Sequence, residues 1–169
     1  MTTIIYHKGQ LATDSQITDR DCRIGHTKKI HPFPGGYLAV AGYADTRPFI
    51  ALFDEVDDPD SMPTHAELKA VTNRYAAIVV FEKPHARVFL VDAGYDDDDP
   101  KDKNVGVFEI MDDSTPIVVG SGGAWAQGAL RAGASISEAI DIASEFDMAT
   151  GGPVQEVTVF KSKATTPRK

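Results

Sequence analysis

The sequence predicts one α+β domain, because strand-like runs fill most of the chain before two helical segments follow one another near its end. Apolar runs of strand length, separated by turn residues, recur up to Val119, and segments of helical period come after it. This grouping favours α+β over the regular strand–helix alternation of a parallel α/β sheet. A chain of 169 residues suits one core rather than two. We therefore assign residues 1–160 to one domain and the basic segment 161–169 to a disordered tail.

The N-terminal segments are typical of a hairpin followed by further strands. Thr3–His7 and Gln10–Ser15 are apolar runs joined through the turn residues Lys8-Gly9-Gln10. His26–Ile30 enters the next strand, and Tyr37–Ala41 forms another. The hairpin returns the end of its second strand towards the amino terminus.

Two short helices are expected between residues 45 and 71. Asp45 or Thr46 is a suitable N-cap for the first helix. The apolar stripe of this helix consists of Phe49, Ile50, Leu52 and Phe53. The acidic, proline-containing stretch Asp54–Asp60 ends it, and a second helix is expected at His65–Val71.

The remaining elements are strands followed by a pair of helices and a last strand. Ser135 and Glu138 form a capping box at the start of the second of these helices. The expected helices are Ala124–Ala132 and Ile136–Phe146. The expected strands are Ala76–Phe81, Arg87–Asp92, Val105–Ile110, Pro116–Val119 and Val154–Phe160.

Composition argues against several classes of protein. The net charge of −8 is unlike the footprint of a protein that binds nucleic acid or an anionic membrane. Cys22 is the only cysteine, so it cannot form an internal disulfide, suits a reducing compartment, and is expected to be at least partly buried. No signal-peptide pattern is visible, and no apolar run approaches the roughly 20 residues that span a bilayer. We expect a cytoplasmic protein with no nucleic-acid partner and no membrane partner.

Other conspicuous residues favour structural roles. The acidic run Asp96–Asp99 lacks the alternating ligands, central glycine and closing glutamate of an EF-hand, which favours a solvated loop tip. The five histidines have no paired metal-ligand spacing. Trp125 is expected in the core or at a subunit contact. Ser121 has Val119 where the elbow of a serine hydrolase requires glycine, which disfavours that class.

Thr2 is the residue that suggests chemistry, because removal of Met1 exposes it as the amino terminus. An N-terminal threonine carries a hydroxyl nucleophile and an amine able to act as its base. The reference pKa of an α-amine, about 7.7–8.0, suits proton transfer near neutrality better than the roughly 10.4 of lysine. The predicted hairpin returns Asp14 towards Thr2, and a lysine of the segment His26–Ile30 enters the same region. A nucleophile, a carboxylate and a cation are therefore expected to converge.

Four stretches extend this pattern along the chain. They are Thr2-Thr3-Ile4-Ile5, Ala12–Ser15, Lys28-Lys29-Ile30 with Ala41–Asp45, and Val119–Gly128. In this order and spacing, the chain resembles the proteasome β-subunit and HslV family of N-terminal nucleophile (Ntn) hydrolases almost from end to end. The last stretch is most similar to HslV, whereas Glu145–Gly152 is more similar to proteasome subunits. The resemblance implies a four-layer αββα sandwich of two antiparallel sheets flanked by helices.

The resemblance also implies catalytic roles for individual residues. Thr2 matches the nucleophile, Asp14 the carboxylate that orients the lysine, and Lys29 the catalytic lysine. Lys28 is the competing candidate, and if the strand alternates its faces, only one of the two lysines can point at Thr2.

Three further positions match supporting residues of the family. The backbone N–H of Gly42 matches the oxyanion donor, Ser121 the serine that hydrogen-bonds near the α-amine, and Asp147 a second supporting aspartate. The backbone carbonyls of Ser144, Asp147 and Thr150 match a site for a monovalent cation, and no other cofactor is required.

The implied function is threonine-type endopeptidase activity inside homo-oligomeric stacked rings, with polypeptide substrates and an ATP-dependent unfoldase as partner. Two alternatives stay open: an Ntn amidase that acts on a small amide, and a proteasome-like scaffold that assembles without cleaving. Retention of Met1 favours the scaffold, because it blocks the amine. The connection Asp54–His65 and the insertion around Asp96 depart from the family pattern, so substrate pockets and partner surfaces are expected to differ.

Overall fold

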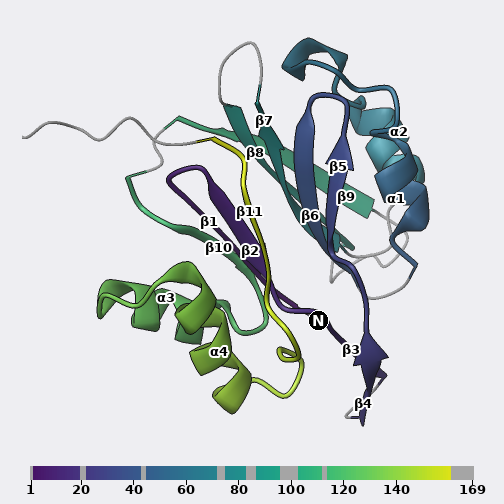
Figure 1. Cartoon of the computed structure of the whole chain (residues 1–169). Coiled ribbons are helices and arrows are strands. Elements are labelled where there is room, and N and C mark those ends of the chain that lie inside the picture. Colours follow the sequence, from purple (N-terminus) through teal and green to yellow (C-terminus); the bar gives the residue numbers. More distant parts are fainter. Residues whose placement is uncertain are drawn as a thin grey trace, which may run out of the picture.

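The computed structural model describes residues 2–19, 22–42, 45–71, 75–82, 87–95, 103–111 and 114–160, and within them the chain has an α+β fold (Figure 1). The first sheet has the order β10-β1-β2-β11 and is antiparallel throughout. Its strands are β1 (Thr3–His7), β2 (Gln10–Thr13), β10 (Ile117–Gly120) and β11 (Gln155–Thr158). The predicted hairpin is confirmed, with Ile4 opposite Thr13.

The second sheet is an antiparallel meander in the order β5-β6-β7-β8-β9. Its strands are β5 (Ile30–Phe33), β6 (Gly36–Gly42), β7 (Tyr75–Phe81), β8 (Arg87–Tyr95) and β9 (Lys103–Ile110). A two-stranded ribbon of β3 (Gln16–Asp19) and β4 (Cys22–His26) leads from the first sheet to the second.

Helices cover the two sheets on their opposite faces (Figure 1). The helical elements are α1 (Arg47–Ala51), the 3-10 turn η1 (Pro59–Ser61), α2 (His65–Ala70), α3 (Gly123–Arg131) and α4 (Ile136–Phe146). The Ser135 hydroxyl accepts from the backbone N–H of Glu138, and the Glu138 carboxylate accepts from the backbone N–H of Ser135, which confirms the predicted capping box. The same box starts α2, between Thr64 and Glu67.

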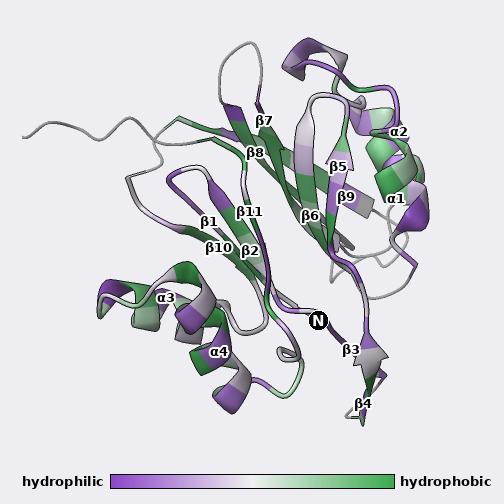
Figure 2. Ribbon diagram, in the orientation of Figure 1, coloured by the Kyte–Doolittle hydropathy of each residue, from purple (hydrophilic) through white to green (hydrophobic). Residues whose placement is uncertain are grey.

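The core lies in three apolar layers, because side chains alternate faces along each strand. On β1, Ile5 packs against α3 and α4, whereas Ile4 and Tyr6 pack towards the second sheet. The far face of the second sheet packs against α1 and α2 through Phe49, Phe53 and Leu68. Figure 2 shows the corresponding hydrophobic residues along the strands and on the covered faces of the helices. Each sheet therefore packs against apolar side chains on both of its faces.

Strand β1 is paired on both edges, which fixes the backbone at its start. Thr3 lies opposite Gly120 of β10, and the Thr2 carbonyl accepts the N–H of Ser121 at 3.1 Å. The N–H of Asp14 donates to the Thr3 carbonyl at 3.3 Å on the other edge. Gly120 has a φ of +102°, and a Cβ added there meets the Thr2 carbonyl oxygen, so this close approach requires glycine.

Several predictions about elements were wrong. The ribbon β3–β4 was not predicted, since its polar sequence carries no strand periodicity, and β2 ends at Thr13 rather than Ser15. Most other elements agree with the prediction to within two or three residues at their ends. Cys22 is exposed rather than buried. Trp125 was expected in the core or at a subunit contact; it is 50% exposed and stacks on Phe146 at 4.8 Å between ring centroids, so it is not in the core, and the subunit contact stays a prediction.

Some predictions concern residues outside the described ranges. These are Met1, the acidic run Asp96–Asp99 and the tail 161–169. Within the described residues, no helix is long and apolar enough to cross a membrane.

Candidate active site

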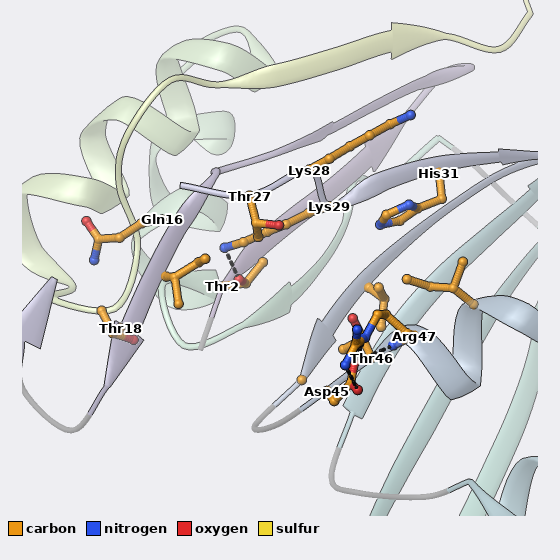
Figure 3. Close-up of a pocket in the computed structure, with 14 residues that line it drawn as sticks. Thr2, Gln16, Thr18, Thr27, Lys28, Lys29, His31, Asp45, Thr46 and Arg47 are labelled. Atoms are coloured by element: carbon orange, nitrogen blue, oxygen red, sulfur yellow. Dashed lines mark hydrogen bonds and ion pairs between the residues drawn. The ribbon is translucent and has the colours of Figure 1, made fainter. Parts of the chain in front are cut away.

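Thr2 lies immediately before β1, and its side chain is close to the Lys29 side chain. The Lys29 ammonium donates a hydrogen bond to the Thr2 hydroxyl (Figure 3). Thr2 is only 3% exposed, and it lies at the wall of a cavity rather than on an open surface. The structure therefore brings together the two side chains that were predicted as nucleophile and catalytic lysine.

Asp14 is completely buried and is held by main-chain donors. Its carboxylate accepts the backbone N–H groups of Thr3 at 2.9 Å, Gln16 at 3.0 Å and Gly151 at 3.2 Å. The same carboxylate accepts the Lys29 ammonium at 2.9 Å. These bonds fix the position and orientation of the Asp14 carboxylate beside the lysine.

Lys29 is a buried cation with one charged partner. Its side chain is 7% exposed. Burial lowers the pKa of its ammonium, and the charge of Asp14 and the hydrogen bond to it oppose this by raising the pKa. The pKa of Lys29 therefore lies below the ordinary lysine value. Its ammonium holds its proton less firmly than that of an exposed lysine while it donates to Thr2.

The Lys28 side chain does not lie beside Thr2. In Figure 3 its side chain points away from Thr2, whereas that of Lys29 points towards it. Lys29 is buried and Lys28 is exposed. Both lysines precede β5, so the predicted alternation of faces along a strand is not what separates them. The Lys29 N–H and carbonyl instead bond to Gln155 at 2.9 Å and to Val40 at 3.2 Å.

Ser121, whose backbone N–H donates to the Thr2 carbonyl, belongs with Asp147 to one chain of polar groups. The Ser121 hydroxyl donates to the Asp147 carboxylate at 2.5 Å, and the Thr150 hydroxyl donates to the same carboxylate at 2.6 Å. Thr150 also shares a 2.7 Å hydrogen bond with the Thr3 hydroxyl. Burial would raise the pKa of Asp147, but the hydrogen bonds from Ser121, Thr150 and the Ala149 N–H outweigh it and lower that pKa.

A cavity of about 530 Å³ opens beside Thr2 and Lys29, within the size range of ligand pockets. Gly42, predicted as the oxyanion donor, lines this cavity together with Thr2. Across from Thr2 lie His31 and the ion pair of Asp45 with Arg47, which the sequence analysis did not assign to the site (Figure 3). Burial lowers the pKa of His31, and the nearby charge of Lys28 lowers it further, so the imidazole is neutral near pH 7.

Asp147 and Ser144, two residues of the predicted cation site, form hydrogen bonds within the protein. The Asp147 carbonyl accepts the Thr150 N–H at 3.1 Å, and the Ser144 hydroxyl donates to the Asp141 carbonyl at 2.6 Å. Within the described ranges, histidine, cysteine and acidic side chains form no cluster of three that could hold a metal ion. A cation bound through backbone carbonyls alone stays a prediction.

Comparisons with known proteins show the fold of the chain. No protein-family model matches it, and no curated protein matches it. Thiobacillus denitrificans BPH in complex with epoxomicin is 21% identical with a TM-score of 0.63, and the match covers 96% of this chain and 98% of that one. BPH alone is 20% identical with a TM-score of 0.61 and covers the same shares. A Gly-1 mutant of Anbu from Hyphomicrobium sp. strain MC1 is 16% identical with a TM-score of 0.64, covering 95% of this chain and 82% of that one.

Proposed function

We propose that this chain is an N-terminal threonine endopeptidase of the proteasome/HslV type, with Thr2 as nucleophile once Met1 has been removed. The observation that carries the proposal is the buried series Thr2–Lys29–Asp14 at the wall of the cavity. A free threonine hydroxyl is too weak an acid to attack a carbonyl without losing its proton during the reaction. The reaction therefore needs fixed groups around the Thr2 hydroxyl that help it to lose its proton.

The proposed reaction assigns a step to each of these groups. The Thr2 hydroxyl oxygen attacks the peptide carbonyl carbon while its proton passes to the Thr2 α-amine. Lys29 stabilises the oxygen as the proton leaves, and Asp14 holds the lysine. The Gly42 N–H stabilises the negative oxygen of the tetrahedral intermediate, a contribution of about 3–4 kcal/mol. The amine product departs with the proton, and water then hydrolyses the ester that remains on Thr2.

The same proposal includes the architecture of the assembled enzyme. The packing of helices, two sheets and helices supports the four-layer αββα sandwich of Ntn hydrolases. We propose homo-oligomeric stacked rings in the cytoplasm, polypeptide substrates, and delivery of these by an ATP-dependent unfoldase. The exposed Trp125–Phe146 stack on α3 and α4 supports assembly, because large exposed apolar groups often mark interfaces.

The test combines intact mass with cleavage of unfolded polypeptide by the purified assembly. We expect a mass without Met1, cleavage by wild type, no cleavage by Thr2→Ala and retained cleavage by Thr2→Ser, which keeps both hydroxyl and amine. Light scattering of each variant shows whether the assembly is unchanged. Epoxomicin, which the BPH structure contains, is expected to block wild type.

Each other outcome overturns a part of the proposal. A retained Met1 with an intact assembly indicates the scaffold alternative. Cleavage at the wild-type rate by Thr2→Ala removes Thr2 from the mechanism. Hydrolysis of small amides with no cleavage of polypeptides indicates the amidase alternative.

A further inference from the structure

Gln155, the first residue of β11, reaches out of the first sheet to the segment that carries Lys29. Its Oε1 accepts the backbone N–H of Lys29 at 2.9 Å and that of Ile30 at 3.5 Å. Its Nε2 donates to the backbone carbonyl of Thr27 at 2.6 Å. One amide side chain therefore contacts both ends of the short segment 27–30.

This segment runs between two elements without belonging to a strand until Ile30. Thr27 is anchored by its N–H, which donates to the Ser15 carbonyl at 2.8 Å, and the Lys29 carbonyl accepts the Val40 N–H at 3.2 Å. The Lys29 N–H is directed to Gln155 instead of a neighbouring strand. A glutamine amide offers the same acceptor and donor as a peptide group, so Gln155 takes the place of a paired strand there.

The position of Gln155 in the sheet links the two halves of the site. Gln155 lies opposite Thr13 of β2, the residue that precedes Asp14. The strand pair that presents Asp14 is thus also the anchor for the backbone of Lys29. Movement of either element changes the distance between the Asp14 carboxylate and the Lys29 ammonium, and with it the approach of that ammonium to Thr2.

We propose that Gln155 is a positioning residue, which fixes the backbone of residues 27–30 and thereby aims the Lys29 ammonium at the Thr2 hydroxyl. The catalytic consequence rests on the proposed function, whereas the structural consequence does not. Gln155 touches neither reacting atom in this arrangement and acts through Lys29.

The test compares Gln155→Ala and Gln155→Glu with Gln10→Ala in the assembled protein. Gln10 is the matched control: it lies on the adjacent strand β2 of the same sheet, and its side chain bonds at the surface to Glu156 and not to the lysine segment. Polypeptide cleavage gives kcat and KM separately. Crystal structures of wild type and Gln155→Ala show where the Lys29 ammonium lies.

We expect Gln155→Ala to lower kcat by roughly 10- to 100-fold with KM changed less than about two-fold, because a displacement of about 1 Å has effects of this size. Gln155→Glu keeps the acceptor for the Lys29 N–H but replaces the donor to Thr27 by an oxygen that repels the Thr27 carbonyl, so its kcat is expected to fall as well. Gln10→Ala is expected to match wild type. In the Gln155→Ala structure, the ammonium is displaced from Thr2 while Asp14 stays in place.

A Gln155→Ala enzyme with kcat within about two-fold of wild type, or with Lys29 undisplaced, overturns the proposal. An equal loss in Gln10→Ala assigns the effect to the sheet as a whole and also overturns it. If mature wild type with a free Thr2 cleaves nothing, the proposed function fails, and the position of Lys29 in the Gln155→Ala structure still decides the role of Gln155.

Discussion

The Lys29 ammonium and the Asp14 carboxylate meet at 2.9 Å in a place where Asp14 has no contact with solvent. Removing one partner of a buried pair leaves a charge without compensation, which is commonly strongly destabilising. Here Asp14 keeps its backbone donors Thr3, Gln16 and Gly151 when the lysine is lost. The carboxylate is therefore able to stay in place in lysine variants, which makes their activity interpretable.

Lys29→Ala is expected to abolish polypeptide cleavage, whereas Lys28→Ala is expected to retain it. Lys29 is buried and donates to Thr2, and Lys28 is exposed and points away. Cleavage assays on both variants, with light scattering to verify assembly, provide the measurement. An inactive Lys28→Ala beside an active Lys29→Ala would reverse the assignment of the two lysines.

The cleavage rate is expected to depend on pH in a bell shape. The rate rises as the Thr2 α-amine loses its proton near its reference pKa of about 7.7–8.0. It falls again as Lys29 loses its proton, with a midpoint below the ordinary value of 10.5, because burial lowers the pKa of Lys29. The measurement is kcat/KM against pH.

Asp14→Asn is expected to move the alkaline limb of this profile to lower pH. The Asp14 charge and its hydrogen bond both raise the pKa of Lys29, so their loss lowers it further. Asp45→Asn is the control, since Asp45 lines the same cavity but pairs with Arg47. An alkaline limb that stays in place in Asp14→Asn would contradict the assignment of this limb to Lys29.

Thr150→Val is expected to destabilise the protein, and Thr150→Ser to restore most of the loss. Valine keeps the volume of threonine but leaves the buried Thr3 hydroxyl without this partner, at a cost of about 1–3 kcal/mol. The expected fall in the melting temperature is roughly 2–12 °C. Equal melting temperatures of Thr150→Val and wild type would show that the Thr3–Thr150 bond contributes nothing.

The same network predicts how stability responds to acid. Hydrogen bonds hold the pKa of Asp147 in the folded protein below its value in the unfolded chain. The ionised carboxylate therefore adds its full contribution to the free energy of unfolding above the unfolded pKa. This contribution is lost as the pH falls through the folded pKa. Thr150 is one of the donors to Asp147. The stability difference between Thr150→Val and wild type should therefore shrink in acid, which denaturant unfolding at several pH values measures.

Gly120→Ala is expected to destabilise the protein and displace Thr2, whereas Gly128→Ala is expected to be tolerated. A Cβ on Gly120 meets the Thr2 carbonyl oxygen, and the φ of +102° strains any other residue. A Cβ on Gly128 meets nothing within 4 Å, and alanine in a helix is favoured over glycine by about 0.5–1 kcal/mol. Thermal unfolding and cleavage assays report both effects. A loss of assembly in Gly128→Ala would instead place that helix face at a subunit contact.

Local signals in the sequence were sufficient for the hairpin that brings Asp14 to Thr2, whereas the roles of Lys29, Ser121 and Asp147 were predicted from the family resemblance. The turn at Lys8-Gly9 predicts the hairpin that returns Asp14 to Thr2, and the structure has it. The capping box at Ser135 likewise marks the start of α4. Turns and caps depend on neighbouring residues alone, so a single sequence carries them.

Other parts of the site could not be predicted because they depend on polar contacts between distant segments. Gln155 and Lys29 are 126 residues apart, and Thr3 and Thr150 are 147 apart. Such pairs leave no periodicity in the chain. Cys22 was misjudged for a related reason, since the ribbon that carries it is a two-stranded, polar element lying outside both main sheets.

The contact between the Gly151 N–H and the Asp14 carboxylate joins the beginning of the chain to its end. These two residues are 137 positions apart in the sequence, so the bond closes a long loop whose entropy cost is met only when the intervening fold forms. Local unfolding of the segment around Gly151 would therefore remove one donor from the Asp14 carboxylate even while β1 and β2 stay paired.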